Sequence, residues 1–466
     1  MMPTPSILVI IVTWNKKDYV LDLLNSLRNL DYSSSAIDTV VVDNASNDGT
    51  AEAIREQFPQ VNLICNPENI GGTGGFNTGL KWAFEQPEGK YKYLWLLDND
   101  VLVHRAALSE LVHLLETKPD VAVAGSTMMQ LDYPWRINEM GAYVKLHSGE
   151  LVLNRHLENI AAWQGKDVYE LLQSDADLSK QLLHCQAYLD VDYVAAASLL
   201  IRADVAKQAG IWRDYFIHFD DVEWCLRIGK MGHRVLASAK SLIWHLSAAA
   251  KVPTWVLYYD NRNILDMMKT HHAGDAALKR TERYIRLKAV YYHLLGKTDL
   301  AGLLQQGLDD YQAGKFGKKD IKLTHNYQPN NNFHKVLANP NFKRIFVSYS
   351  VNLQATAVQE AFIQAMLKRP ELEITFMAQP AGAEIYQLPR ARFLRISSNR
   401  VKRWWHYWKL RGQFDLVIQS DYAPVIGLSW LNAAIVFIND EGFCERPAPQ
   451  WSAVWQAGMR WLKSHF

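Results

Sequence analysis

The sequence predicts an α/β fold in which a largely parallel, doubly wound sheet carries helices on both faces. Apolar runs at 7–12 and 39–42 lack the alternation of a half-exposed strand, so we expect strands buried on both faces. Apolar residues recur at helical spacing between them, from Tyr19 to Leu27. The stretch from Asn44 to Gly49 is rich in turn-forming residues and leads into a further helix. Strands that alternate with helices in this way indicate a parallel sheet.

The remaining elements of the first 250 residues follow in chain order. The pattern predicts a helix at about 50–58, strands at 61–64 and 93–97, a polar helical insertion near 167–183, and an apolar run at 191–201. From 121 onward the pattern is mixed, so strand directions there are not predicted.

The length of 466 residues predicts about three domains, and changes of pattern place their boundaries. After Pro253 the sequence is helical and basic through about 297, and Gly, Asn and Pro are frequent from 312 to 342. A new βα pattern begins at Arg344. The predicted divisions are an α/β domain over 1–250, a helical basic extension over 251–311, a linker over 312–342, and a Rossmann-like α/β domain over 343–466.

Composition excludes several classes of protein. The formal charge of +2 argues against a general basic coat for nucleic acid. The four cysteines are far apart and form no CxxC pair, so neither a zinc knuckle nor a disulfide framework is expected. The run at 7–12 is too short to span a membrane and lacks a basic flank. We therefore expect a cytoplasmic protein without a signal peptide.

Polar residues follow each predicted strand of the first domain. In open α/β sheets, ligands bind beyond the carboxyl ends of the strands. The residues at these positions are Thr13 and Asn15, Asp43 and Asn44, the stretch 69–75, and 98–100. One edge of the sheet is therefore expected to be polar and acidic.

The triplet Asp98-Asn99-Asp100 offers two carboxylates that could bind a divalent cation and, through it, a diphosphate. An Asx turn that ends a strand is the alternative, and it is the commoner explanation of an isolated DxD. His245 ends an apolar stretch and could be a third ligand, although a histidine packed in the core would look the same.

The stretch Asn69-Ile-Gly-Gly-Thr-Gly-Gly-Phe-Asn77 predicts a loop whose backbone N–H groups can approach a ligand closely. It matches neither a Walker A loop nor a strict GxGxxG fingerprint, so it argues against a binding site for ATP or for a nicotinamide cofactor. A flexible connection is the alternative.

The segment Phe219-Asp220-Asp221-Val-Glu223-Trp224 places acids just before a predicted helix. Acids at this position stabilise the helix N-terminus, which is the plain structural explanation. The functional alternative is that one of these carboxylates is a general base for an attacking hydroxyl.

Taken together and in this order, these motifs resemble family 2 inverting glycosyltransferases of the GT-A fold. The resemblance covers about half of the chain and adds Thr13-Trp14-Asn15 and Ile243-Trp244-His245 to the segments above. The glycine stretch, the acidic segment and Tyr258-Tyr259-Asp-Asn-Arg262-Asn263 are most similar to bacterial galactofuranosyltransferases and polymer rhamnosyltransferases.

The resemblance implies roles for individual residues. Asp221 would be the catalytic base, Asp98, Asp100 and His245 would bind Mn²⁺ or Mg²⁺, and Asp43 would bind uracil or ribose. The implied nucleotide-binding set is Thr13, Asn15, Asp43, Asn44, Asn69, Gly72, Gly74 and Asp98. The implied sugar or acceptor contacts are Trp212, Asp220, Trp224 and Arg262.

The resemblance also implies a reaction. An inverting, metal-dependent enzyme would transfer galactofuranose from UDP-galactofuranose to a growing bacterial surface glycan such as O-antigen. The alternatives are a rhamnosyltransferase that uses dTDP-rhamnose, and a carbohydrate- or nucleotide-binding module without catalysis. The acceptor would be an oligosaccharide or a lipid-linked sugar.

The last domain resembles the first half of a GT-B glycosyltransferase in its βα rhythm, so it is expected to be either a shortened GT-B half or a docking module. From Arg390 to Arg411 it has eight Lys or Arg residues and no acid, interleaved with aromatic residues. This composition suits the inner face of the cytoplasmic membrane or a lipid-linked diphosphate. No nucleic-acid-binding motif accompanies it. A solvated helix face is the alternative.

Overall fold

The computed structural model describes residues 4–246, 255–321, 332–351, 353, 356–378, 392–397, 399–420, 425, 427–438, 442, 444–446, 449 and 451–464. Contacts within the chain divide it into two compact units. The N-terminal unit contains Met1–Lys251, Val256–Glu282 and Gln306–Ile321, and the C-terminal unit contains Val252–Trp255, Arg283–Gln305 and Lys322–Phe466. The helical region after 255 is thus shared between the two units.

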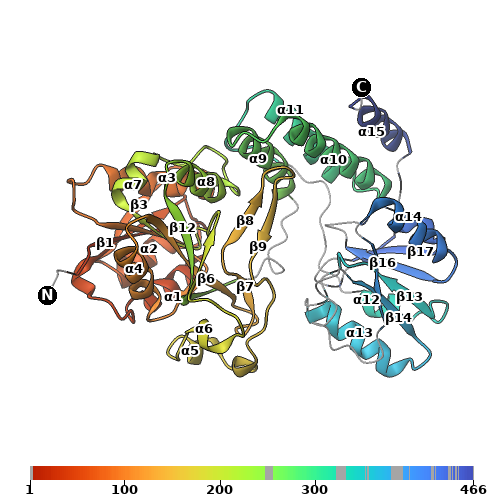
Figure 1. The fold of residues 1–466 in the computed structure, drawn as a ribbon, viewed down its shortest axis with the longest axis horizontal. Coiled ribbons are helices and arrows are strands. Elements are labelled where there is room, and N and C mark those ends of the chain that lie inside the picture. Colours follow the sequence, from red (N-terminus) through yellow and green to blue (C-terminus); the bar gives the residue numbers. More distant parts are fainter. Residues whose placement is uncertain are drawn as a thin grey trace. The chain divides into compact units, whose positions relative to one another are not determined.

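The N-terminal unit is built on a ten-stranded sheet (Figure 1). Its strands are β1 (Ile7–Thr13), β2 (Ile37–Asp43), β3 (Asn62–Cys65), β4 (Tyr93–Asp98), β5 (Val101–Val103), β6 (Val121–Gln130), β7 (Ile137–Glu139), β10 (Tyr188–Val191), β11 (Ser198–Arg202) and β12 (Arg234–His245). The order is β10-β12-β6-β11-β4-β1-β2-β3, with β5 paired to β12 and β7 to β6. A separate two-stranded ribbon contains β8 (Ala142–Lys145) and β9 (Glu150–Leu153).

The four strands predicted in the first hundred residues are present and parallel, in the order β4-β1-β2-β3. The rest of the sheet is mixed, because β11 runs antiparallel between β4 and β6. The predicted apolar run at 191–201 contains the end of one strand, β10, and most of another, β11.

Helices cover both faces of this sheet, as the unbroken apolar runs predict. Their bounds are α1 (Lys17–Leu27), α2 (Thr50–Gln57), α3 (Gly71–Phe84), α4 (Ala107–Thr117), α7 (Ala203–Ala209) and α8 (Asp220–Lys230). In β1, Val9 belongs to the core on the face covered by α1, α2 and α4, whereas its neighbour Ile10 belongs to the core on the opposite face, covered by α3, α7 and α8. Successive side chains of a strand point to opposite faces of the sheet, and helices cover both faces, so successive residues of the strand must be apolar.

The polar insertion contains two single-turn helices, α5 (Val168–Leu171) and α6 (Leu178–Gln181), rather than one longer helix. Each begins at an aspartate whose carboxylate accepts a bond from a backbone N–H two residues later. Asp167 accepts from Tyr169 at 2.8 Å, and Asp177 accepts from Ser179 at 3.1 Å. These caps divide the segment.

The predicted helical region after Pro253 contains α9 (Val256–Thr270), α10 (Asp275–Leu294) and α11 (Thr298–Gln312). Residues 322–331 of the predicted linker lie outside the described part. Its later portion includes α12 (Phe333–Leu337), whose Phe333 and Leu337 are buried in the core of the C-terminal unit. The domain boundaries expected at 250, 311 and 342 remain predictions.

The C-terminal unit has the predicted βα arrangement. Its strands are β13 (Arg344–Val347), β14 (Glu373–Ala378), β15 (Arg392–Arg395), β16 (Leu416–Ser420), β17 (Ala434–Ile438) and β18 (Cys444–Glu445). They form a sheet in the order β15-β14-β13-β16-β17-β18, parallel except for β18. The helices α12 and α13 (Thr356–Lys368) pack on one face and α14 (Arg400–Lys409) on the other, and α15 (Trp451–Lys463) follows β18.

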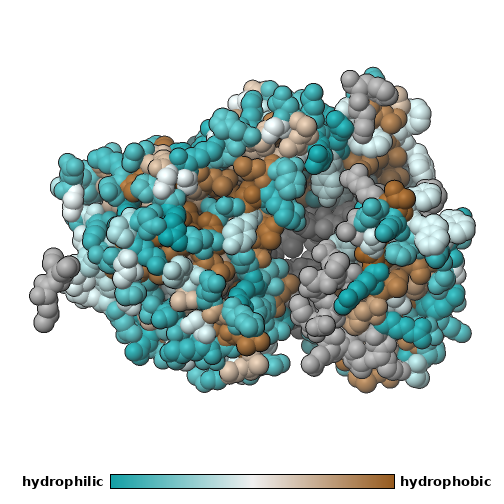
Figure 2. All heavy atoms as spheres, viewed as in Figure 1, coloured by the Kyte–Doolittle hydropathy of each residue, from teal (hydrophilic) through white to brown (hydrophobic). Residues whose placement is uncertain are grey.

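Hydrophilic side chains cover much of the N-terminal unit on the face shown in Figure 2. Among the described residues, no helix is long and apolar enough to cross a membrane.

Candidate active site

The carboxyl ends of the parallel strands bring the predicted polar residues to one edge of the N-terminal sheet. In the strand register, Thr13 lies opposite Asp43, and Val12 lies opposite Asp98. Thr13 and Asp43 are buried, and the Thr13 hydroxyl accepts a bond from the Asn99 side chain at 3.0 Å. The predicted polar edge is therefore present, with Thr13 linked to the 98–100 triplet.

The loops after β1 and β2 are bonded to each other. The backbone N–H of Asn15 donates to the Ser46 hydroxyl at 2.8 Å, and the Asn15 side chain accepts from the Asn47 N–H at 2.8 Å. The Ser46 hydroxyl in turn donates to Asp43. Asn15 has a φ of 49°, which asparagine tolerates better than most residues. These bonds hold Asn15 and Asp43 in one rigid corner.

The glycine stretch is the first part of helix α3, not the loop that the sequence predicts. Asn69 accepts a bond from the Gly71 N–H at 2.8 Å, and the Asn44 side chain donates to the Gly71 carbonyl at 2.8 Å. Gly71 has a φ of +78°, and a Cβ there would lie 2.1 Å from the Phe216 carbonyl oxygen. A Cβ on Gly75 would lie 2.3 Å from Val12. Close packing therefore explains two of the glycines.

Gly72 and Gly74 differ in their surroundings. A Cβ on Gly74 would contact the Ile70 side chain at 2.7 Å, whereas a Cβ on Gly72 would meet no described atom within 4 Å. Of these two predicted nucleotide-binding glycines, Gly72 is the one that faces open space.

Asp98, Asp100 and His245 converge as predicted from the resemblance. Their ligand atoms all lie within 4.8 Å of one another. His245 Nε2 lies 3.1 Å from Asp100 Oδ1 and 3.7 Å from Asp98 Oδ2. Pairing of β12 with β5 places His245 opposite Val101, just after Asp100. Two carboxylates and an imidazole form a donor set that suits Mn²⁺ better than Mg²⁺.

The acidic segment begins helix α8, and the preceding loop is strained. Phe216, His218 and Phe219 all have φ values between 65° and 67°. Such conformations cost on the order of 1–3 kcal/mol each and need support from their surroundings. Asn263 supplies part of that support, since its amide donates to the carbonyls of Ile217 at 2.8 Å and His218 at 3.0 Å.

The three acids of this segment have different environments. Asp220 is buried and accepts a bond from the Thr73 hydroxyl at 2.5 Å. Asp221 accepts from the backbone N–H groups of Ala196 at 3.1 Å and Val222 at 2.8 Å. The pKa of Asp221 is raised to about 7, mainly by burial and in addition by the negative charge of Asp220. Burial also raises the pKa of Asp220.

Glu223 is explained as a structural residue. It is buried and forms an ion pair with Arg227 at 2.7 Å. Burial alone would raise the pKa of Glu223, but the His271 imidazole, whose Nε2 lies 3.4 Å from Glu223 Oε1, and the bond from Arg227 outweigh burial and hold this pKa below its usual value. A carboxylate with a lowered pKa is a weak proton acceptor, so Asp221 is the better general base.

Glu139 is a candidate that the sequence did not reveal. It ends β7 opposite Met128 and is buried, and burial raises its pKa to about 7, although the charge of His245 lowers it. Its charge also raises the pKa of Asp221. Glu139 therefore interacts with both His245 and Asp221. Its sequence neighbourhood matches no motif, and the only signal was an acid within a predominantly apolar segment.

Two of the predicted sugar or acceptor contacts are tryptophans that lie in the interior. Trp212 and Trp224 are buried, with ring centroids 5.7 Å apart, and Trp212 also packs on Phe76 at 4.8 Å. Neither ring is exposed to stack on a sugar in this structure, which favours the alternative of core packing for both. Large apolar faces are buried more readily than exposed. In contrast, Trp14 at the end of β1 is exposed.

Arg262 is likewise a structural residue. It is buried, and its guanidinium donates to the carbonyls of Tyr215 at 2.8 Å and Gly317 at 2.9 Å. Because these bonds use the donors inside the protein, Arg262 does not face nucleotide or acceptor. Together with Asn263, it supports the chain just before the acidic segment.

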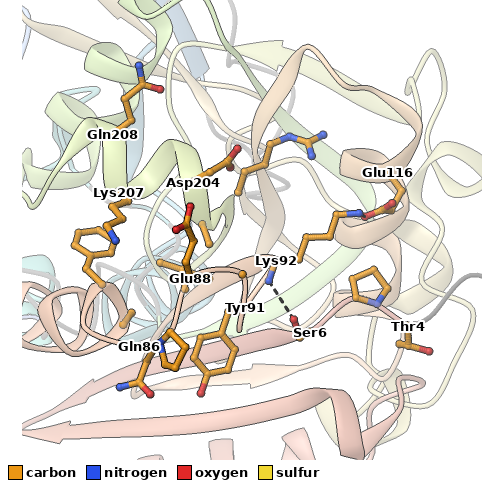
Figure 3. A pocket seen from close by; sticks show the side chains of 18 residues that line it. Thr4, Ser6, Gln86, Glu88, Tyr91, Lys92, Glu116, Asp204, Lys207 and Gln208 are labelled. Carbon is orange, nitrogen blue, oxygen red and sulfur yellow. Dashed lines mark hydrogen bonds and ion pairs between the residues drawn. The ribbon is translucent and has the colours of Figure 1, made fainter.

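The cavity in Figure 3 lies elsewhere in the N-terminal unit. It has a volume of about 1380 Å³ and is lined by residues that precede β1 and β4, including Ser6, Tyr91 and Lys92. The Lys92 N–H donates to the Ser6 hydroxyl at 3.2 Å (Figure 3). The amino ends of the strands form this cavity, opposite the edge that holds Asp98, and none of the predicted site residues is among its described lining.

Residues 3–263 match the family model described as glycosyltransferase-like family 2. This match covers more than half of the chain and includes every predicted site residue. The chain belongs to this family. The match confirms the resemblance drawn from the motifs, and with it the GT-A fold and the interpretation as a glycosyltransferase.

Several curated proteins are similar to this family 2 chain. The galactofuranosyltransferase GlfT2 of Mycobacterium tuberculosis is 24% identical over 67% of this chain and 49% of its own length. GlfT2 of Mycolicibacterium smegmatis is 24% identical over 54% of this chain and 38% of its own length. The chain thus spans at most about half the length of these relatives. The solved mannosyltransferase PcManGT from Pyrobaculum calidifontis aligns with a TM-score of 0.40 and 16% identity, over 67% of this chain and 89% of that chain.

Proposed function

We propose that this chain is an inverting, metal-dependent hexosyltransferase that transfers galactofuranose from UDP-galactofuranose to a growing bacterial surface glycan such as O-antigen. The observation that carries the proposal is the pair of carboxylate sites in the N-terminal unit. One is the cluster of Asp98, Asp100 and His245. The other is Asp221, a half-buried carboxylate whose pKa is raised to about 7. A metal-dependent, inverting glycosyl transfer needs both a cation site and a base.

The nucleotide would bind along the polar edge. Thr13, Asn15, Asp43 and Asn44 form the bonded corner after β1 and β2. Asn69 holds the start of α3, where Gly72 faces open space. Asp43 is held by Ser46 at a fixed position, which suits recognition of uracil or ribose. Gly74 would act only through its backbone.

The cation would be held by Asp98, Asp100 and His245. The fit rests on their convergence within 4.8 Å and on their mixed oxygen and nitrogen donors. When bound, a Mn²⁺ or Mg²⁺ ion would supply positive charge to the leaving diphosphate. Asp98 is more exposed than Asp100, so Asp98 is the better placed of the two to meet an incoming donor.

Asp221 would accept the proton of the attacking acceptor hydroxyl. The N–H groups of Ala196 and Val222 fix its orientation, and its raised pKa makes it a stronger base than an ordinary carboxylate while leaving it largely ionised above neutral pH. Asp220, bonded to Thr73, raises the pKa of Asp221 and would lie beside the acceptor. Attack from the face opposite the leaving diphosphate inverts the anomeric configuration.

The donor assignment rests on the similarity to the two galactofuranosyltransferases. A rhamnosyltransferase that uses dTDP-rhamnose is the second candidate from the motifs. A binding module without catalysis has less support, because the residues proposed for metal binding and for proton transfer are both present. The acceptor would be an oligosaccharide or a lipid-linked sugar, and the reaction would take place in the cytoplasm.

The test is a transfer assay on the purified chain. We expect UDP release and a galactofuranosyl product from UDP-galactofuranose, Mn²⁺ and a synthetic galactoside, with no product after EDTA. Nuclear magnetic resonance of the new anomeric proton would report inversion. Parallel reactions with dTDP-rhamnose separate the two donors. Nucleotide binding without transfer from any donor would overturn the enzyme proposal in favour of a binding module.

A further inference from the structure

Helix α14 of the C-terminal unit presents an apolar stripe to solvent. Val401, Trp404, Trp405 and Trp408 are spaced at i, i+3, i+4 and i+7, so they share one face of the helix. Their side chains are between 53% and 78% exposed. The helix packs on its own unit through a different face, where Tyr407 is buried beside Leu410. The exposed stripe is therefore not the face that completes the core.

Helix α15 carries a second stripe of the same kind. Trp451, Trp455, Met459 and Leu462 are spaced at i, i+4, i+8 and i+11, and each is exposed. Ala457 is buried, and the other residues of this helix are half-buried or exposed. A helix of 13 residues is marginal in water on its own, because nucleation is costly. Something that covers the apolar stripe would stabilise it.

Basic residues border both stripes, and neither helix contains an acid. Lys402 and Lys409 are exposed and seven residues apart, so they lie along the same edge of the α14 stripe. The Lys409 ammonium lies 3.5 Å from the centroid of the Trp405 ring. Arg460 and Lys463 occupy the last turn of α15. The charge on these faces is therefore uniformly positive.

Figure 2 is consistent with this description. Near-white and brown spheres, the colours of weakly polar and apolar residues, gather where Figure 1 places α14 and α15. Most described tryptophans of the N-terminal unit are buried or half-buried, with Trp14 as an exception, whereas those of α14 are all exposed.

We propose that the stripes of α14 and α15 bind the surface of an anionic phospholipid bilayer. Tryptophan prefers the boundary between lipid headgroups and acyl chains, and Lys and Arg beside it bind anionic headgroups. Charge complementarity favours this occupant over a second copy of the chain, because two copies would bring like charges together. The inference goes beyond the transfer reaction and does not depend on the donor sugar. Its consequence is that the N-terminal unit works close to lipid-borne acceptors.

The test is sedimentation of the full chain with phospholipid vesicles, without any sugar nucleotide. We expect the chain to bind vesicles that contain phosphatidylglycerol more tightly than vesicles of phosphatidylcholine alone, and to release as salt rises. Combined replacement of Trp404, Trp405 and Trp408 by Ser should weaken binding roughly tenfold or more. The Lys402→Glu/Lys409→Glu variant should lose the preference for phosphatidylglycerol.

Matched controls come from the N-terminal unit. Tyr169→Ser removes an exposed aromatic residue there, and Lys207→Glu reverses an exposed charge; both should leave vesicle binding unchanged. The two lysines on α14 are exposed, so their variant remains informative if the tryptophan variant fails to fold.

Three results would overturn the proposal. One is a folded wild-type chain that stays in the supernatant with both vesicle types. Another is vesicle binding by folded variants that equals the wild type. The last is a wild-type chain that does not bind vesicles and is an oligomer by light scattering, together with a tryptophan variant that is a monomer. That result would assign the stripes to contacts between copies. Transfer to a soluble acceptor, measured separately, reports on the proposed reaction alone.

Discussion

Two groups of acids in the N-terminal unit have the same side-chain chemistry and different surroundings. Asp98 and Asp100 follow β4 and face His245, and Asp98 is partly exposed. Asp220 and Asp221 begin α8; Asp220 is buried and Asp221 is half-buried, and burial raises the pKa of both. Cation binding needs an ionised carboxylate, whereas a general base works best with a pKa near the working pH. Burial and neighbouring groups, rather than residue type, thus separate the two roles.

Asp221→Asn should have the largest effect. Loss of the proton acceptor should lower kcat by about a hundredfold to ten-thousandfold. UDP affinity should be unchanged, because Asp221 lies outside the nucleotide-binding corner. Rates from the transfer assay and UDP titration by calorimetry measure the two quantities. An active Asp221→Asn variant would contradict this role and make Asp220 or Glu223 the next candidate for the base.

Asp100→Asn should affect the proposed cation site and leave proton transfer by Asp221 intact. Removing one ionised donor from the Asp98, Asp100 and His245 cluster should weaken Mn²⁺ binding in the presence of UDP by about tenfold to a hundredfold. Raising the Mn²⁺ concentration should restore much of the transfer rate, which it should not do for Asp221→Asn. Glu88→Gln, at the opposite end of the sheet beside the cavity of Figure 3, is the matched control. Equal Mn²⁺ affinity in the wild type, Asp100→Asn and Glu88→Gln would contradict the role of Asp100 as a metal ligand.

The parts of this site that depend on local sequence could be predicted. The strands β1 to β4 follow from apolar runs, and parallel pairing then places Thr13, Asp43 and Asp98 at one edge. The ligand cluster also follows, because Asp98 and Asp100 are two residues apart and the family motif supplies His245.

The remaining parts depend on tertiary packing that the sequence does not show. The glycine stretch predicts a loop, but Gly71 and Gly75 are needed where α3 packs closely against Phe216 and Val12. Trp224 and Arg262 occur in motifs typical of ligand contact, yet both are buried in the interior. Glu139 is buried opposite Met128 by the pairing of β7 with β6, and from there its charge raises the pKa of Asp221.

Glu223→Gln should separate a structural acid of α8 from Asp221, the proposed base at the start of the same helix. Glu223 lies two residues after Asp221 but is paired with Arg227 at 2.7 Å. Replacing it should lower the free energy of unfolding by about 1–3 kcal/mol, because a buried charge-assisted bond is weakened. The rate of transfer well below the melting temperature should remain close to that of the wild type. A large loss of kcat with unchanged stability would contradict the structural role and make Glu223 part of the proton transfer.

The smallest effect concerns the pH at which Asp221 ionises. Transfer should require ionised Asp221, so kcat/KM should fall as the pH drops through about 7, the pKa of Asp221. The negative charge of Glu139 raises the pKa of Asp221. Glu139→Gln removes that charge, so the acidic limb should move to lower pH, by about one unit or less. A profile of kcat/KM against pH measures the shift.

The direction of this shift distinguishes three roles for Glu139. A limb that moves to lower pH, with transfer retained at high pH, means that Glu139 acts through the charge it places near Asp221. An unmoved limb means that a group other than Asp221 controls the pH dependence, which would weaken the separation between the two acid groups. Loss of transfer at every pH, as expected for Asp221→Asn, would make Glu139 itself the proton acceptor. In that case the raised pKa of about 7 that burial gives Glu139 would be the one that matters for catalysis.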